Sequence, residues 1–342
     1  MTNSGTRPGP SFSAAAPDAS RVDRAQRDRD ELADCIVMLR GELASVAEGS
    51  DRERELLEDL AAALLDRHEE GYPPLGELPE SDLDSAISYA DRLLAGVSNG
   101  HRDRYLFTSA VAHYYRFLLS ENLADLDATI LHLSVITAGD NDDDPPVDVL
   151  AMLGNALAMR YDMVPAGAPT ELSDLSEAIR VTAVVRDMLA DDDPAKIACV
   201  DDLGALHFDR HLRQKRDGGH DLSSAIGCFR WLRFAAGRGD PVVAEATTRL
   251  GMALSERVLL HGNVPADVDE AIAALASAGR LLSPEDPRCP VAALYLGIML
   301  GVRFTMHGGD SRDRAGAITK LRQTLAQAAS PVEADDHRVG RR

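Results

Sequence analysis

The chain repeats one phrase six times at a steady interval, and this repetition limits its fold more than any other feature. An Asp-x-x-x-Ala/Thr-Ile element recurs with spacings of 43, 49, 47, 46 and 46 residues between its isoleucines. The copies are Asp82–Ile87, Asp125–Ile130, Asp174–Ile179, Asp221–Ile226, Asp267–Ile272 and Asp313–Ile318. Self-similarity at a period of this size is the signature of a repeat protein.

A second element stands ahead of each of these copies. It has nine residues, with Gly or Ala in the second place and Arg in the eighth. The copies are Leu60–His68, Ser109–Phe117, Leu153–Tyr161, Leu203–His211, Leu250–Val258 and Leu296–Phe304. The arginines are Arg67, Arg116, Arg160, Arg210, Arg257 and Arg303, and the glycines are Gly154, Gly204, Gly251 and Gly297. Each unit therefore consists of two elements in a fixed order.

Both elements have the pattern of helices. In the first element apolar residues recur at i, i+4 and i+8, which is one face of a helix. Gly costs up to about 1 kcal/mol in a helix interior relative to Ala, so its return in four copies indicates close packing against a neighbouring helix. The second element opens with Asp, a residue favoured at helix N-caps. The residues expected to cap the second helices are Asp82, Asp125, Asp174, Asp221, Asp267 and Asp313.

Further start signals support the same helices. Asp-Pro dipeptides at Asp144, Asp193 and Asp240 predict where first helices begin, because Asp is a good N-cap and Pro a good first helical residue. Glu177 and Glu270 follow the aspartates of their second elements by three residues, which is the spacing of a capping box. The phrase therefore encodes a helix, a polar loop and a second helix.

One helix pair cannot bury its apolar stripe alone, whereas stacked pairs can. The sequence therefore predicts an all-α fold, an α-solenoid of about six helix-turn-helix repeats over residues 51–329 with an N-terminal capping helix over 21–50. The aromatic content of 4% agrees with closely packed helices rather than with sheets. Residues 1–20 and 330–342 are expected to be disordered tails.

The composition restricts the partners of such an array. The formal net charge is −20 and the pI is about 4.8, so the surface is expected to repel nucleic acids and anionic membranes. The N-terminus has no apolar stretch that predicts a secretory signal, and no run of 18 uncharged apolar residues predicts a membrane span. The widely spaced cysteines, Cys35, Cys199, Cys228 and Cys289, are expected to be reduced thiols of a cytoplasmic protein.

The phrases LGNALAMRY…DLSEAI and LGMALSERV…DVDEAI resemble the tetratricopeptide-like (TPR-like) arrays of actinobacterial proteins, which often precede a caspase-like CHAT protease domain. The resemblance covers residues 51–329 and implies an interaction scaffold or a regulatory module. The period of 43–49 residues exceeds the usual tetratricopeptide length of about 34. The residues after 330 are too few for a protease domain, so a CHAT activity is not carried over.

The repeated arginine has two interpretations. A ladder of cations would bind an acidic ligand, whereas a structural arginine would reach the loop or the aspartate that begins the second helix of its own unit. The structural interpretation is favoured, because a charge buried between helices must be paired.

Two histidines spaced by four residues raise the question of a metal site. His207 and His211 have a spacing that metals use, but Phe208 stands where an HExxH motif has glutamate. In other copies of the repeat Tyr161 and Phe304 take the place of His211. A hydrogen-bonded interior histidine is therefore favoured over a ligand, and no metal is expected.

Other candidate motifs fail. The acidic stretch Asp140–Pro145 lacks the glycine and glutamate that an EF-hand loop needs. Phosphate-loop, dinucleotide-binding and nucleophile-elbow patterns are absent from the sequence. The chain is therefore expected to be no enzyme and to use no cofactor.

These observations favour a non-catalytic scaffold that binds a protein or peptide of basic character on a concave face lined by first helices. Differences between the units place the contact region in the second and fourth copies. The candidate contact residues are His113, Tyr114, Tyr115, His207 and Phe208. The alternatives are a regulatory sensor that binds a small ligand or peptide, and an accessory subunit of an enzyme or of a CHAT-type system.

Overall fold

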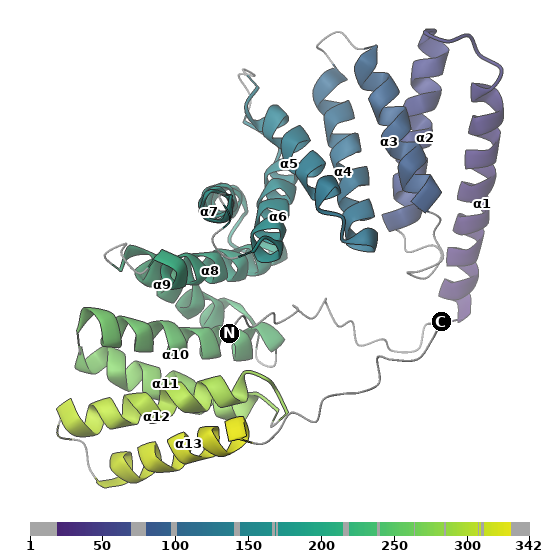
Figure 1. Cartoon of the computed structure of the whole chain (residues 1–342). Helices are drawn as coiled ribbons and strands as arrows, with labels where there is room; N and C mark the ends of the chain where they lie inside the picture. The colour runs from purple at the N-terminus through teal and green to yellow at the C-terminus, as the bar shows by residue number, and fades with distance from the viewer. Residues whose placement is uncertain are drawn as a thin grey trace. The chain divides into compact units, whose positions relative to one another are not determined.

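The structure, a computed structural model, is built from helices (Figure 1). It describes residues 19–69, 80–96, 101–139, 144–165, 168, 170–214, 219–237, 240–262, 264–283, 285–306, 308 and 311–329. Over these residues the chain forms thirteen helices and no strand, which confirms the predicted all-α fold. The predicted tails, apart from the start of the first helix, lie outside the described residues.

The helices belong to two compact units, Met1–Asp144 and Pro145–Arg342. The first unit holds α1 (Ala19–Leu43), α2 (Asp51–Glu69), α3 (Glu80–Ala95), α4 (Arg102–Ser120) and α5 (Leu123–Thr137). The pairs α2/α3 and α4/α5 are its two repeats, and α3 also packs against α4. The N-terminal helix α1 packs against α2 and buries Ile36 and Leu39.

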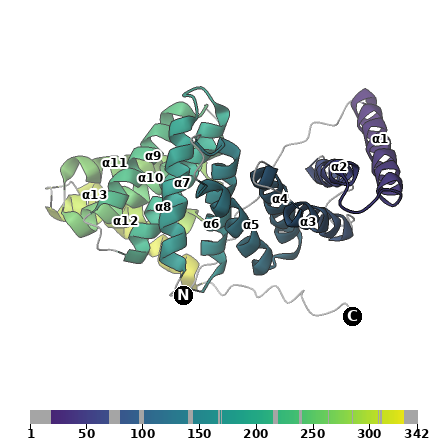
Figure 2. The ribbon, with the colours of Figure 1, turned by 90° about the horizontal axis from the view of Figure 1, so that it is seen from above.

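The second unit holds the other four repeats. Its helices are α6 (Val147–Met163), α7 (Glu171–Met188), α8 (Pro194–Gln214), α9 (His220–Ala235), α10 (Pro241–His261), α11 (Pro265–Leu281), α12 (Cys289–Met306) and α13 (Ser311–Ala329). Each first helix packs against the second helix of its own repeat, and α8, α10 and α12 also pack against the second helix of the repeat before (Figure 2). This stacking of helix pairs is that of an α-solenoid.

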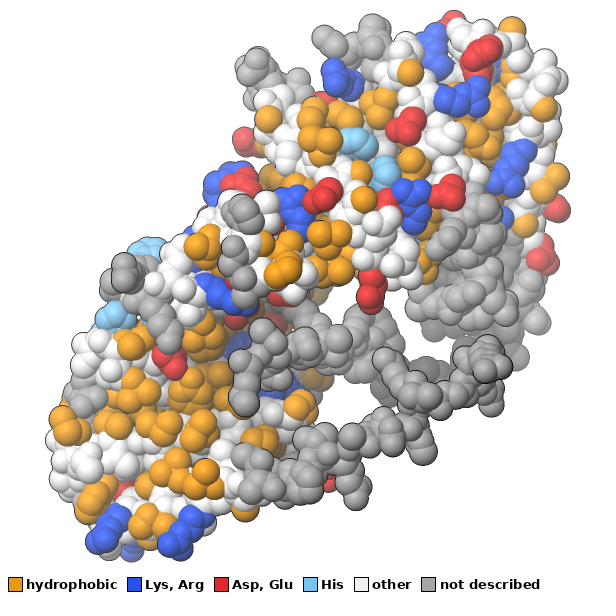
Figure 3. All heavy atoms as spheres, viewed as in Figure 1, with side chains coloured by type: hydrophobic (Ala, Val, Ile, Leu, Met, Phe, Trp, Pro, Cys, Tyr) orange, Lys and Arg blue, Asp and Glu red, His pale blue; other side chains and the backbone are white. Residues whose placement is uncertain are grey.

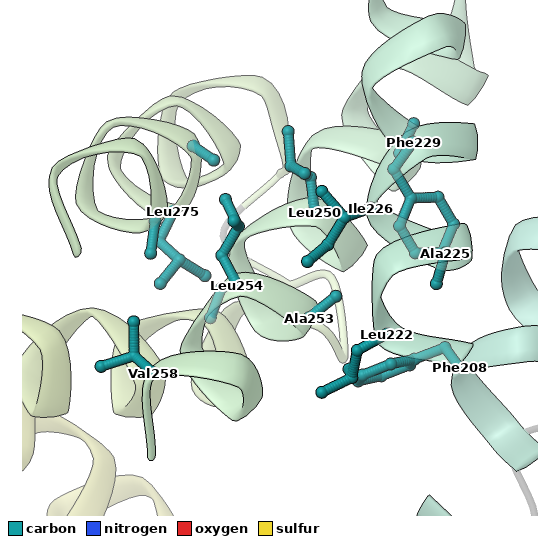
Figure 4. Packing of buried hydrophobic residues seen from close by; sticks show 14 of the residues in the cluster. Phe208, Leu222, Ala225, Ile226, Phe229, Leu250, Ala253, Leu254, Val258 and Leu275 are labelled. Carbon is teal, nitrogen blue, oxygen red and sulfur yellow. The ribbon is translucent and has the colours of Figure 1, made fainter. Parts of the chain in front are cut away.

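The core of the second unit shows how one repeat covers the next. Leu222 and Ile226 of α9 face Leu250 and Ala253 of α10 (Figure 4), and all four side chains are at most 1% exposed. The isoleucine that ends the second element is thus buried beneath the first helix of the following repeat. This junction explains why the sequence returns to Ile at this place in every copy.

The glycines of the first element lie where helices touch closely. A Cβ atom on Gly251 would stand 2.5 Å from Cγ of Leu275, and one on Gly204 would stand 2.7 Å from Cε1 of Phe229. Both neighbours belong to the second helix of the same repeat. A side chain here would force the pair apart, so glycine sets the spacing within the repeat.

The prediction that the repeated aspartates are N-caps is wrong. The N-cap of α5 is Asn122, whose side chain accepts a hydrogen bond from the Ala124 amide at 3.1 Å, so Asp125 lies inside the first turn. In α11 the helix begins at Pro265, two residues before Asp267. The helices start earlier than predicted because upstream residues begin them, and the aspartates are left to face the first helix.

The capping-box prediction is also wrong. Glu177 binds Arg180 on its own helix with an N–O distance of 2.6 Å. Glu270 binds Arg230 of the preceding repeat, with Arg230 Nε 2.9 Å from Oε1. Both glutamates lie too far along their helices to reach an N-cap amide, and arginine offers a stronger, charge-assisted partner.

The Asp-Pro signals succeed at two of three places. Asp240 accepts a hydrogen bond from the Val242 amide at 2.9 Å, and α10 begins at Pro241 as predicted. Helix α8 likewise begins at Pro194. The prediction that α6 begins at Pro145 is wrong, because a second proline follows and disfavours helical backbone in the residue before it. That helix begins at Val147.

Within the described part of the chain one helix, α12, has the length and composition of a membrane span. Its sequence contains Arg303, which forms an ion pair with Asp313. In the second unit it packs against α11 and α13.

Candidate functional site

The six repeated arginines all reach the second helix of their own repeat. Arg257 donates from Nε to Oδ2 of Asp267 at 2.9 Å and from Nη2 to Oδ1 at 2.6 Å. The same fork-like contact joins Arg160 to Asp174, Arg210 to Asp221 and Arg303 to Asp313, and Arg116 and Arg67 bind Asp125 and Asp82. Each of the six aspartates is buried. Two parallel charge-assisted bonds make this a strong and directional contact.

The electrostatics of the pairs follow from this geometry. Burial opposes ionisation of Asp221, but hydrogen bonds from Arg210 and His207 outweigh it and lower the pKa of Asp221 to about 2. Burial likewise opposes ionisation of Asp125, while Arg116 and His113 lower the pKa of its carboxyl. These carboxylates are therefore charged and paired at neutral pH, and the arginines that hold them are engaged rather than open to a ligand.

The repeated arginines Arg303 and Arg116 also connect neighbouring repeats. Arg303 donates from Nη1 to Oδ1 of Asp269 in α11 at 2.9 Å, and Arg116 binds Asp84 in α3. Asp84 and Asp269 occupy the same place in their repeats, three residues before the isoleucine. The arginine therefore links one helix pair internally and, in these two copies, to the pair before it.

The histidines of the second and fourth repeats join the same pairs. Nδ1 of His113 lies 2.8 Å from Oδ1 of Asp125, and Nδ1 of His207 lies 2.7 Å from Oδ1 of Asp221. Burial lowers the pKa of His207, although its bond to Asp221 acts in the opposite direction. The two histidines are equivalent residues in a repeated Arg-Asp-His arrangement.

The structure divides the predicted contact residues into two groups. His207 and Phe208 are buried, and Phe208 packs beside Leu222 in the core (Figure 4). Tyr114 and Tyr115 are half-buried on α4 in the first unit. A partner would reach the tyrosines but would have to open the repeat to reach His207 or Phe208. Within the described residues no group of three or more His, Cys, Asp or Glu is placed to hold a metal.

A groove of about 280 Å³ opens beside the first helices of the first unit. Helix α2 contacts α4 directly here, as α10 contacts α8 and α12 in the second unit. The groove is lined by the apolar residues Ala61, Ala62, Leu65, Leu93, Phe107 and Val111 and by the polar residues Glu58, Asp66, Arg104, Tyr105 and Thr108. The groove thus has an apolar floor and charged edges.

The charged residues at the edge of the groove differ in their ion pairing. Glu58 forms an ion pair with Arg104, Nη1 to Oε2 at 2.9 Å, and also accepts a hydrogen bond from the Tyr105 hydroxyl. Burial and this bond raise the pKa of Tyr105 to about 12. Asp66 and Asp59 are exposed carboxylates on the same helix. With Glu58 held by Arg104, Asp66 places a negative charge at the edge of the groove, and Asp59 lies about two turns before it on α2.

An aromatic cluster, His68 of α2 with Tyr114 and Tyr115 of α4, lies toward the C-terminal ends of these two helices. The ring of His68 lies 4.5 Å from that of Tyr115, and the rings of Tyr114 and Tyr115 are 6.2 Å apart. Residues 104, 107, 111, 114 and 118 follow one another at helical spacing along α4. Apolar and aromatic side chains therefore extend along this stripe of α4 beyond the groove.

Comparison with known proteins gives one structural similarity and no family. No protein-family model matches the chain, and no curated protein matches it. Among solved structures it is similar to the nearly identical TPR-like repeats of a kinesin light chain from Podosopora anserina, with 9% identity over 81% of this chain and 98% of that chain and a TM-score of 0.28. Because that superposition is poor, the fold assignment rests on the repeats and helix contacts of this chain.

Sequence reasoning missed the groove itself. At the third and seventh places of the first element the first copy has Ala62 and Asp66, where the fifth has Met252 and Glu256. The fourth copy also has Ala and Asp there, Ala205 and Asp209. These two places therefore do not single out the first repeat, and the groove depends on how its helices pack.

Proposed function

We propose that this chain is a non-catalytic protein-interaction scaffold, and that the groove beside α2 and α4 binds a partner segment carrying apolar and basic side chains. The observation that supports the proposal is the groove itself, an apolar floor edged by the exposed Asp66. Apolar burial supplies affinity, and the negative charge at the edge selects basic residues.

The size of the groove favours a protein segment over a small ligand. Pockets that enclose small molecules usually measure about 300–1,000 Å³ and bury most of the ligand. This groove is smaller, and along α4 it is followed by the aromatic cluster of His68, Tyr114 and Tyr115. An amphipathic helix or an extended peptide placed along α4 would contact Phe107 and Val111 and then the tyrosines.

The same proposal extends to the chemistry of the partner and to where the protein is located. The net charge of −20 favours a basic partner whose binding weakens with salt. The cysteines are free thiols, which agrees with a cytoplasmic protein. The resemblance to arrays that precede CHAT domains adds a protease of that class to the candidate partners.

Photo-crosslinking in the native cell tests the proposal. Benzoylphenylalanine placed at Ala62, an exposed groove residue, should capture a partner, whereas the same group at Leu131 on α5 should not. With the purified partner, Asp66→Lys should weaken binding at least tenfold, about 1.4 kcal/mol, and salt should weaken binding to the unmodified chain.

The controls separate the groove from general acidity. Asp187→Lys changes an exposed acid on α7 by the same charge and should leave the affinity within twofold. Equal losses for Asp66→Lys and Asp187→Lys would contradict a specific groove. Thermal stabilisation by a small metabolite with no protein captured would favour the sensor alternative.

A further inference from the structure

The last repeat leaves open a face that the following repeat covers at the preceding junctions of the second unit. Ile226 is 1% exposed beneath α10, Ile179 is 6% exposed and Ile272 is partly buried, whereas Ile318, at the same place in α13, is 42% exposed. Leu325 lies two turns further on and is 68% exposed. Two apolar side chains therefore face solvent on one stripe of α13.

The partner helix α12 is incompletely covered as well. It is apolar along most of its length, yet only 22% of its residues are buried. Phe304 is half-buried, while its counterparts in the third and fifth repeats, Tyr161 and Val258, are 6% and 1% exposed. Tyr161 bonds to Arg213 of the next repeat's first helix, which shows that this place faces the following repeat.

Basic side chains lie on the same face of α13. Every earlier repeat has Leu or Val, at most 2% exposed, four residues before the isoleucine, and α13 has the exposed Arg314 there. Arg322 is exposed four residues after Ile318. Helix α13 contains four basic residues against one acid, Asp313, which Arg303 neutralises. In a chain of net charge −20 this is a local reversal of sign, and Figure 3 shows blue side chains gathered with orange ones at the α13 end of the molecule.

We propose that the α12/α13 face binds an acidic amphipathic helix of a partner protein, in the position that the first helix of a following repeat would occupy. The internal junctions indicate which apolar residues the partner helix should carry, since α10 covers α9 with Leu250 and Ala253. Arg314 and Arg322 define the other half, because carboxylates on the helix flanks would pair with them.

Other occupants fit this face less well. A solvated cap would need polar residues in place of Ile318 and Leu325, since terminal repeats are expected to present a polar outer face. A symmetric pair of chains joined through this face would bring Arg314 and Arg322 of each copy toward those of the other, and like charges repel. A membrane surface would have to approach a strongly acidic chain.

A probe can be taken from the chain itself. The segment 51–69 is the first helix of the first repeat, with a Leu and Ala stripe and seven acids against three arginines, a net charge of −4. A fluorescein-labelled peptide of this sequence should bind the full-length chain saturably in fluorescence anisotropy. A scrambled peptide of the same composition should not, because it lacks the stripe.

Three variants locate the site. Leu325→Asp and Arg314→Glu with Arg322→Glu should each weaken peptide binding at least tenfold, and high salt should weaken binding to the unmodified chain. Leu131→Asp removes a similarly exposed leucine, 61% exposed on α5, and should leave binding within twofold. Unchanged circular dichroism shows that each variant is folded.

Several results would overturn the proposal. No saturable peptide binding, or binding that Leu325→Asp leaves intact, removes the face as a helix site. A dimer in sedimentation velocity that Leu325→Asp dissociates assigns the face to a second copy. Co-sedimentation with phosphatidylserine vesicles that Leu325→Asp abolishes assigns it to a membrane surface.

Discussion

The junction between α2 and α4 in the first unit differs from its counterpart between α10 and α12 in the second. At the second junction Tyr295 donates its hydroxyl to Glu256 at 2.7 Å, and Met252 and Ile298 pack against the core. At the first junction Ala62 takes the place of Met252, and a groove remains. One repeated phrase thus builds both junctions, and the side chains between the two first helices differ from one junction to the other.

The arginine–aspartate pairs are the part that both junctions share. Arg257→Ala should lower the free energy of unfolding by about 3 kcal/mol, because it leaves the buried carboxylate of Asp267 without its partner. Arg67→Ala in the first unit should cost less, about 1–2 kcal/mol, because Arg40 also contacts Asp82 at 3.3 Å. Urea unfolding followed by circular dichroism measures both.

The control for these variants is Arg280→Ala, which removes an exposed arginine near the end of α11 and should change stability by less than about 0.5 kcal/mol. Equal stability of Arg257→Ala and Arg280→Ala would show that the pair does not hold the repeat together, and the ligand-ladder interpretation of the arginines would regain support.

Exchanging one residue between the junctions tests the open and closed surfaces directly. Ala62→Met should fill the groove and weaken partner binding about tenfold, which is about 1.4 kcal/mol, while leaving the unfolding midpoint nearly unchanged because residue 62 is exposed. Met252→Ala should instead cost about 1 kcal/mol of stability, because this half-buried side chain packs against the core. If Met252→Ala weakened partner binding as much as Ala62→Met, the groove would not be the site.

The pH dependence of stability gives the smallest expected difference between the units. The pKa of Asp221 is lowered to about 2, so its contribution is complete above the pKa of an unfolded aspartate, about 4, and is lost as the pH falls toward 2. Asp221→Asn should therefore be less stable at pH 7 but lose less stability between pH 4 and pH 2. Asp125→Asn should change in the same direction in the first unit, because the pKa of Asp125 is also lowered.

Urea midpoints at a series of pH values measure this effect. Asp59→Asn alters an exposed carboxylate and serves as the matched control, with an acid limb like that of the unmodified chain. A variant at Asp221 whose acid limb also matched the unmodified chain would contradict the role of that carboxylate.

Most of the fold could be predicted from the sequence, because the same pattern of two packed helices recurs six times. The period predicted the helix pairs, and Gly251 predicted close approach of two helices. Helix starts were harder to predict. Asn122 and Pro265 begin their helices ahead of the aspartates, and in isolation Asp is an equally good cap. Which residue caps depends on where the first helix holds the aspartate, a tertiary contact.

The contact residues were harder still. His207 and His113 differ from the apolar residues at their place in other copies, which made them candidates for a surface. In the structure the difference serves the interior, because both imidazoles bind the repeated aspartate. A departure from the repeat pattern does not reveal whether it faces a partner or a neighbouring side chain.

The sequence by itself determined the repeat, the pairing of helices and the acidic character of the chain, because period, propensity and charge are properties of local sequence. Tertiary structure decided that the arginines bind the aspartates rather than the loops, where a groove stays open, and that Ile318 is exposed while Ile226 is buried. These outcomes depend on what packs against a residue, and identical local phrases have different neighbours along the array.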